Sequence, residues 1–235
     1  MSRSEESGKY QEKPKIAGQP STLASPFDGV AEEYDAWFDE TGKLVFETEL
    51  RSLQQVLPSL HKPWLEIGIG TGRFAQALGI ETGVDISMPM LNTAAGRNLN
   101  VVLARGELLP FDSNLFSTVF MITVLCFMEW SSVVLREAYR ILKPGGKLVL
   151  ADMPSGSSWT QLYEHLKQQN DPVYKYAVFY SYNDLIGLVE REGFSVQDTV
   201  STLLQNPDGI TRTEEPHKGF TAGSGFVVIV AGKQL

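Results

Sequence analysis

The sequence predicts an α/β protein whose sheet is Rossmann-like, doubly wound and mostly parallel. From Phe27 onward, stretches with helical spacing of apolar residues alternate with short β-rich runs, which is typical of a parallel sheet covered by helices on both faces. A loop with three glycines follows the first expected strand, and an acidic residue ends the second. These two features mark the ligand-binding edge of such a sheet.

The expected elements follow one another along the chain. Residues 44–57 repeat apolar side chains at three- and four-residue spacing, as an amphipathic helix does. A Lys-Pro-Gly-Gly sequence ends a later helix at Leu142. Around these we expect strands at 64–67, 82–86, 101–104, 117–125 and 147–152, and helices at 72–78, 88–96 (capped by Ser87) and 131–142.

The C-terminal part breaks this alternation. A capped helix at 181–194 precedes a strand at 195–204, whereas residues 205–224 carry proline, glycine, threonine and charge without helical spacing. The last apolar run, 226–232, therefore follows a strand with no crossover helix in between. Because a parallel return usually needs such a helix, we predict that the final two strands pair antiparallel.

The chain is long enough for one domain. It has 235 residues, of which 43% are hydrophobic, so it can bury a substantial core. Residues 1–26 are polar and lack periodicity, and we expect a disordered or loosely attached leader there, followed by one domain at 27–235. No stretch approaches the roughly 18 apolar residues of a membrane span, and no signal peptide is visible. We therefore expect a cytoplasmic protein.

Charge and cysteine usage argue against two classes of partner. The net charge is −8 and no basic run is present, which disfavours a nucleic acid. The single cysteine, Cys126, cannot form an internal disulfide, and the three histidines are far apart in the sequence. We therefore expect no metal site, and we expect Cys126 to be a buried small apolar residue.

The most informative stretch runs from Trp64 to Ser87, WLEIGIGTGRFAQALGIETGVDIS. Its glycines, Gly68, Gly70 and Gly72, allow the backbone to turn sharply after a strand and allow a ligand to approach the main chain closely. Asp85, at the end of the next strand, is placed to accept both hydroxyls of a ribose. Together these residues predict a nucleoside site.

The spacing indicates which nucleoside this site binds. The dinucleotide fingerprint is G-x-G-x-x-G, whereas this chain has E-x-G-x-G-x-G, with Glu66 two residues before Gly68. A carboxylate that leads into the loop is a poor neighbour for phosphates and a good one for a cation. S-adenosylmethionine is a nucleoside with a sulfonium, an ammonium and no phosphate. The spacing therefore counts against the alternative of an NAD(P)-dependent oxidoreductase.

This stretch resembles the glycine motif of class I S-adenosylmethionine-dependent methyltransferases. Other segments are similar to the branch that includes the quinone-biosynthesis (ubiquinone/menaquinone) methyltransferases: VAEEYDAWF at 30–38, GVDIS at 83–87, GELLPFDSNLFSTVF at 106–120 and REAYRILKPGGKLVLAD at 136–152. The resemblance implies a seven-stranded sheet with the last strand antiparallel, and methyl transfer from S-adenosylmethionine to a small-molecule acceptor. A catalytically silent S-adenosylmethionine-binding module is the alternative.

The resemblance also implies cofactor-binding residues. Tyr34 is expected to close over the methionine end, and the end of the fourth strand, at 123–127, is expected to flank the sulfonium. Arg105 stands where the family usually has an acid that meets the adenine, so adenine is held either by the backbone of 105–107 or by Glu107. The expected cofactor-binding residues are Tyr34, Glu66, Gly68, Gly70, Gly72, Asp85, Gly106, Glu107 and Thr123.

An aromatic-rich insertion follows the fifth strand at 153–180. Its tryptophan, tyrosines and phenylalanine either pack a core or form a lid over a small organic substrate, and we favour the lid. The sequence shows no clear general base, so no catalytic residue is assigned. The expected substrate pocket comprises Phe127, Trp159, Tyr176 and Phe179.

Overall fold

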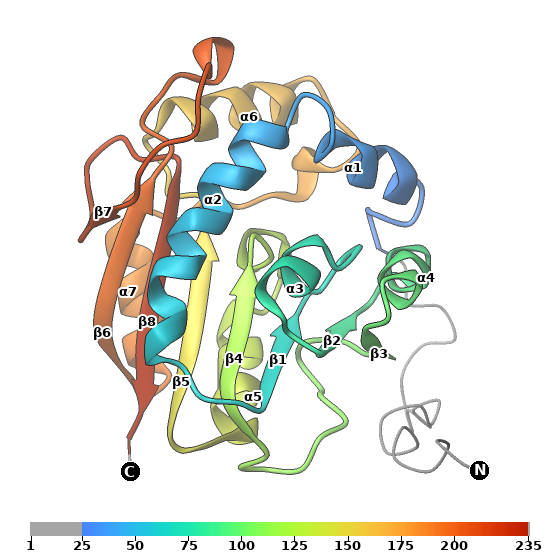
Figure 1. Cartoon of the computed structure of the whole chain (residues 1–235), viewed down its shortest axis with the longest axis vertical. Coiled ribbons are helices and arrows are strands. Elements are labelled where there is room, and N and C mark those ends of the chain that lie inside the picture. Colours follow the sequence, from blue (N-terminus) through green and yellow to red (C-terminus); the bar gives the residue numbers. More distant parts are fainter. Residues whose placement is uncertain (1–24, 235) are drawn as a thin grey trace.

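A computed structural model of the chain describes residues 25–234, and residues 1–24 of the expected leader lie outside this part. One sheet of eight strands runs through it in the order β3-β2-β1-β4-β5-β8-β6-β7 (Figure 1). The strands are β1 (Trp64–Ile67), β2 (Thr82–Asp85), β3 (Asn100–Leu103), β4 (Phe116–Ile122), β5 (Leu142–Asp152), β6 (Phe194–Thr202), β7 (His217–Lys218) and β8 (Phe226–Lys233).

The strand pairing confirms the predicted fold class. Neighbouring strands from β3 to β5 are parallel, whereas β8 runs antiparallel to both β5 and β6. The two long C-terminal strands thus pair antiparallel, as predicted, with Thr199 opposite Ile229. The sheet has one strand more than expected, because the two residues of β7 pair with Val200 and Ser201 at its edge. So short a strand leaves no β pattern in the sequence.

Helices cover both faces of the sheet (Figure 1). On one face, α2 and α3 contribute Leu53 and Phe74 to the core, and on the other, α5 and α7 contribute Leu135 and Leu185. The helices are α1 (Ala31–Trp37), α2 (Lys43–Val56), α3 (Arg73–Leu78), α4 (Met88–Gly96), α5 (Ser131–Ile141), α6 (Ser158–Gln168) and α7 (Tyr182–Arg191), with short 3₁₀ turns at η1 (Leu57–Ser59), η2 (Leu125–Phe127), η3 (Tyr174–Tyr176) and η4 (Pro207–Gly209).

Local signals in the sequence set several of these boundaries. Ser87 caps α4 by accepting a hydrogen bond from the Met90 N–H, as predicted. The strand β5 begins at Leu142, earlier than expected, because the Lys-Pro-Gly-Gly sequence forms an irregular start of this strand. Gly145 there has a φ of +73°, and the register with β4 shifts after Phe116.

The topology brings several loops to one edge of the sheet. The carboxyl ends of the parallel strands β1, β2, β4 and β5 meet there, and α1 and α6 lie over the same edge (Figure 1). A ligand is expected at this edge in an open α/β sheet. Within the described residues, none of the helices is long and apolar enough to cross a membrane.

Candidate active site

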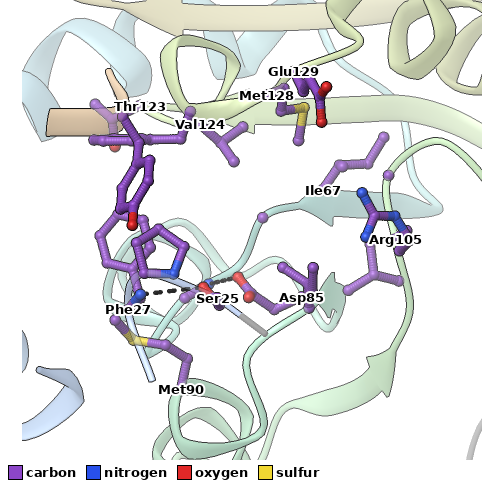
Figure 2. A pocket seen from close by; sticks show the side chains of 18 of the residues that line it. Ser25, Phe27, Ile67, Asp85, Met90, Arg105, Thr123, Val124, Met128 and Glu129 are labelled. Atoms are coloured by element: carbon purple, nitrogen blue, oxygen red, sulfur yellow. Dashed lines mark hydrogen bonds between the residues drawn. The ribbon is translucent and has the colours of Figure 1, made fainter. Parts of the chain in front are cut away.

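A cavity of about 580 Å³ opens at this edge, around the carboxyl ends of β1, β2 and β4 (Figure 2). Its volume lies in the usual range for sites that enclose a small molecule. The structure brings most of the predicted site residues together on its wall, although they come from separate segments of the chain. Those that line it are Tyr34, Gly68, Gly70, Asp85, Gly106, Glu107, Thr123, Phe127 and Tyr176.

The three glycines after β1 serve different purposes. All have positive φ angles, +76° at Gly68, +53° at Gly70 and +81° at Gly72, which L side chains rarely adopt. A Cβ on Gly68 would lie 2.2 Å from Val124, and one on Gly72 would lie 2.4 Å from Leu99. A Cβ on Gly70 would meet nothing within 4 Å. Gly70 therefore keeps space open at the cavity wall, whereas Gly72 permits close packing and does not line the cavity.

Asp85 joins the loops that follow β1 and β2. Its Oδ2 accepts a hydrogen bond from the Gly70 N–H at 2.9 Å, and its Oδ1 accepts one from the Ser87 N–H at 2.8 Å. Burial raises the pKa of this carboxyl, and the two N–H groups partly oppose that shift. The carboxylate is thus fixed at the cavity wall (Figure 2), with lone pairs left to accept hydrogen bonds from a ligand.

Glu66 lies behind the glycine loop rather than on the cavity wall. It is only 2% exposed, and its Oε2 has no hydrogen-bond partner among the described residues. Burial raises its pKa well above the ordinary value, and the charge of Asp85 adds to that shift. Because an unpaired buried carboxylate is costly, its surroundings favour a positive group nearby.

The segment after β3 contributes Arg105, Gly106 and Glu107 to the cavity wall. The Arg105 Nε lies 3.4 Å from the Glu107 Oε2, so these two side chains pair with each other. Figure 2 shows Arg105 on the same side of the cavity as Asp85. The ion pair balances the two charges, which leaves the backbone of this segment as a neutral surface for a base.

Thr123 has an unusual backbone at the end of β4. Its φ is +48°, in the left-handed region that a β-branched residue rarely adopts, and its N–H donates to the Ala151 carbonyl at 2.8 Å. This turn directs the chain from the sheet into η2, so that Val124 and Phe127 both line the cavity. Strain of this kind gathers at functional sites, and nothing in the local sequence predicted it.

An ion-pair cluster holds α1 over the cavity. The Asp35 carboxylate accepts hydrogen bonds from Arg73 of α3 and from Arg97, the residue that follows α4, at 2.8–2.9 Å. Burial acts to raise the pKa of Asp35, but the hydrogen bonds from the two guanidinium groups lower it to about 2. Asp35 therefore anchors α1, and the neighbouring Tyr34 lines the cavity.

Sequence reasoning missed part of this wall. Ser25 and Pro26 fall in the expected leader, yet both line the cavity, so the domain begins at least two residues earlier than predicted. The Phe27 ring lies 5.8 Å from the Tyr34 ring and 5.0 Å from the Phe127 ring. A polar stretch without periodicity gives no signal for such a tertiary contact, so only the three-dimensional fold reveals it.

Trp159 and Phe179, two residues of the expected substrate pocket, do not line this cavity. Trp159 is 4% exposed, and its indole N–H donates to the Gln205 carbonyl at 2.8 Å. The Phe179 ring stacks against Tyr163 with centroids 6.0 Å apart. Both side chains thus pack against the rest of the fold, because Gln205 and Tyr163 offer them a hydrogen-bonding and an aromatic contact outside this cavity.

Other residues of the 153–180 segment take their place. Tyr176, the last residue of η3, lines the cavity, and so do Val178 and Tyr180, at alternate positions of the extended stretch that follows. The Val178 N–H donates to the Cys126 carbonyl at 2.8 Å, which fixes this stretch beside η2. The alternation explains why Phe179, between two lining residues, points elsewhere.

Comparisons with known proteins agree with this site. The family described as "Methyltransferase domain" matches residues 65–150, which contain the glycine loop, Asp85 and the end of β4. A solved structure from Thermotoga maritima, described as a "SAM-dependent methyltransferase, possible histamine N-methyltransferase", has 34% identity and a TM-score of 0.83. The superposition covers 89% of this chain and 99% of that one.

Two relatives extend the comparison. An uncharacterised protein of Methanocaldococcus jannaschii is 38% identical over 207 residues, which are 88% of this chain and 98% of the relative. The demethylmenaquinone methyltransferase of Streptomyces griseus is 30% identical over 155 residues, which are 60% of this chain and 64% of the relative. The chain is thus similar to the first relative over most of its length and to the second over part of it.

Proposed function

Since the chain belongs to the S-adenosylmethionine-dependent methyltransferases, we propose that it is an active enzyme that transfers the methyl group of this cofactor to a small organic acceptor. One observation supports this most strongly. The cavity combines a fixed carboxylate at Asp85, open space at Gly70 and an unpartnered buried acid at Glu66. This set suits a nucleoside that carries positive charge and lacks phosphate.

The residues of the cofactor side bind different parts of S-adenosylmethionine. Asp85 accepts the ribose hydroxyls, and the backbone at Gly70 gives the methionine portion close access to the main chain. Glu66 offers a buried carboxyl group behind the loop, whose charged form a nearby cation would stabilise, and Gly106 and Glu107 hold the adenine. An NAD(P) cofactor fits less well, because its phosphates would lie beside the acidic side chains of Glu66 and Asp85, which offer them no positive charge.

When bound, S-adenosylmethionine supplies a methyl group made electrophilic by its sulfonium. The chain's own residues align the acceptor with that methyl, and such positioning contributes roughly 7–11 kcal/mol to catalysis. The rings of Phe27, Tyr34 and Phe127 keep water from the methyl end of the cavity. A dry wall favours the reaction because a neutral nucleophile and a cation disperse charge as they react.

Relatives suggest two classes of acceptor for this site. The name of the Streptomyces griseus protein points to demethylmenaquinone, and the description of the Thermotoga maritima structure points to an amine. Either class would have to place its reacting group in the cavity of about 580 Å³ that also holds the cofactor.

A methyl-transfer assay tests the proposal. The full chain is incubated with S-adenosylmethionine that carries a deuterated methyl group, together with amines, phenols or reduced quinones. Mass spectrometry then detects any product that has gained the labelled methyl group. We expect transfer to one class. Melting temperatures should rise with S-adenosylmethionine and S-adenosylhomocysteine but not with NAD or ATP. Cofactor binding without transfer to any class would favour the silent regulatory module, and a shift with NAD alone would contradict the proposal.

A further inference from the structure

We propose that Glu49 of α2 binds the methyl acceptor, and that this acceptor is a small amine that arrives as an ammonium ion. This inference rests on the proposed methyl transfer and names the substrate class for the same cavity. Glu49 belongs to none of the motifs in the sequence. Its place in the structure, on the inward face of α2 within the apolar cluster that contains Tyr34 and Phe127, is what assigns it a role.

Glu49 is a buried acid without a partner. It lies on the inward face of α2 with Val45 and Leu53, and it is 6% exposed. Within residues 25–234, its carboxylate makes neither an ion pair nor a hydrogen bond, although nearly all buried polar groups in proteins are paired. An uncompensated buried carboxylate costs several kcal/mol. A cationic ligand would remove that cost.

A row of aromatic rings runs beside this carboxylate. The first ring belongs to α1 and the second to the segment just before that helix. The next two belong to η2 and η3, and the last belongs to α6. Neighbouring ring centroids lie 5.8, 5.0, 6.4 and 4.5 Å apart along Tyr34, Phe27, Phe127, Tyr174 and Tyr163.

The same acid raises the pKa of the tyrosine at each end of the row. After burial, the charge of Glu49 is the next largest cause that raises the pKa of the Tyr34 hydroxyl, and the same holds for the Tyr163 hydroxyl. Val45 and Leu53, which flank Glu49 on the inward face of α2, pack in the same apolar cluster as Tyr34 and Tyr163, so the carboxylate and the row lie in one region of the fold. Aromatic faces attract ammonium groups, and this attraction strengthens when the cation is desolvated. A carboxylate at the end of such a row completes a site for an amine.

The row reaches into the methyl-donor cavity. Phe27, Tyr34 and Phe127 line that cavity, and Glu66 and Asp85 also raise the pKa of Tyr34. The ionisable groups that act most strongly on Tyr34 and Tyr163 are acids, with Glu49 first among them. The ionisable groups that share this region are Tyr34, Glu49, Glu66, Asp85, Cys126, Asp152, Tyr163 and Tyr174.

Glu49 also has the proton affinity that an amine acceptor requires. Burial raises its pKa to about 8, so it can take a proton near neutral pH. In the reaction, the Glu49 carboxylate takes one proton from R–NH₃⁺, and the freed nitrogen lone pair forms an N–C bond to the methyl carbon. The C–S bond breaks, and its electron pair remains on sulfur. The product leaves as R–NH₂CH₃⁺, and Glu49 returns its proton to water.

The first test measures binding without any reaction. Benzyltrimethylammonium and phenol serve as a cationic and a neutral probe, each titrated by calorimetry into the full chain with S-adenosylhomocysteine present. The variants are Glu49→Gln and a control on the same helix, Glu47→Gln, whose side chain is less buried and has no role in the row. We expect the wild type to prefer the cation. Glu49→Gln should weaken cation binding about tenfold or more and leave phenol binding unchanged, because only a cation gains from the charge.

Two further measurements distinguish a failure of this inference from a failure of the proposed function: cation binding by Glu47→Gln, and S-adenosylhomocysteine binding by all three proteins. Glu47→Gln should bind the cation like the wild type, and all three proteins should bind S-adenosylhomocysteine equally. Equal cation binding by Glu49→Gln and the wild type would overturn the inference, as would a wild type that prefers phenol. The wild-type comparison needs no variant, so it holds even if a substitution disturbs folding. Failure of the wild type to bind S-adenosylhomocysteine would instead contradict the proposed function.

The second test follows the pH profile of amine methylation. In the wild type, kcat/KM should rise with pH at a value set by Glu49, below the pKa of the free amine. In Glu49→Gln, the rise should move to the pKa of the amine itself, because no group in the site then takes the proton. An unmoved profile would contradict the role of Glu49 as proton acceptor.

Discussion

We assign the cofactor side of the cavity to one stretch of the chain, residues 64–107, and the acceptor side to α1, η2 and the 153–180 segment, completed by the proposed role of Glu49 in α2. On the cofactor side, backbone groups dominate: glycines with positive φ and N–H groups that hold Asp85. On the acceptor side, side chains dominate, with a row of rings beside Glu49. Backbone geometry constrains a short sequence tightly, while side chains from distant segments can change one at a time. The two sides should therefore respond differently to substitution.

Substitution of Asp85 should have the largest effect on cofactor affinity. Asp85→Asn removes the charge that strengthens hydrogen bonds from the ribose hydroxyls, and each such bond is worth about 1.5–3 kcal/mol. We expect cofactor affinity, measured by calorimetry, to fall about 10- to 150-fold. Asp112→Asn, at an exposed turn away from the cavity, should change little. Equal effects at both positions would show that the ribose lies elsewhere.

A pair of glycines separates the need for space from the need for backbone freedom. Gly70 and Gly79 both have positive φ, and a Cβ on either would meet nothing within 4 Å. Only Gly70 lines the cavity. Each substitution to alanine should lower the free energy of unfolding by about 1–2 kcal/mol, but only Gly70→Ala should also weaken cofactor binding. If Gly79→Ala weakens binding as much, the loss reflects strain alone.

The contrast between the two sides also explains what the sequence could predict. The fold, the glycine loop and Asp85 follow from spacing, because alternation and positive-φ glycines leave a local pattern. Glu49 and Phe27 leave no such pattern, since the place of each side chain in the structure depends on how α1 and α2 pack over the sheet edge. The sequence predicts where the aromatic insertion lies but not which of its side chains face the cavity. Its composition gave no means to separate Tyr176, which faces the cavity, from Phe179, which packs on Tyr163.

The 153–180 segment gives a sharper test within the acceptor side. We propose that it acts as a lid, with Tyr176 as a contact to the acceptor, because this side chain is 56% exposed and lines the cavity. Tyr176→Ala should raise the KM for the acceptor several-fold, about 1 kcal/mol, with cofactor affinity and melting temperature nearly unchanged. Phe179→Ala should mainly lower the melting temperature. The reverse pattern would place the acceptor on the other face of this segment.

Substitution of Glu49 should have the smallest effect on cofactor binding. It should instead change how the free energy of unfolding depends on pH. Its pKa is raised from 4.5 to about 8 in the folded chain, so the stability it contributes is full below 4.5 and is lost as the pH rises through 8. From about pH 6 to about pH 7, the wild type should lose about 1 kcal/mol relative to Glu49→Gln in urea unfolding. A constant difference between the two proteins over this range would mean that Glu49 titrates as in water.

The most direct measurement is a crystal structure of the chain with S-adenosylhomocysteine bound. The account predicts that both ribose hydroxyls lie within hydrogen-bond distance of the Asp85 carboxylate. It also predicts that the sulfur faces the rings of Tyr34 and Phe127, and that the adenine lies along residues 105–107. A ribose bound away from Asp85, or a sulfur directed away from the aromatic row, would contradict both the cofactor side and the acceptor side as described.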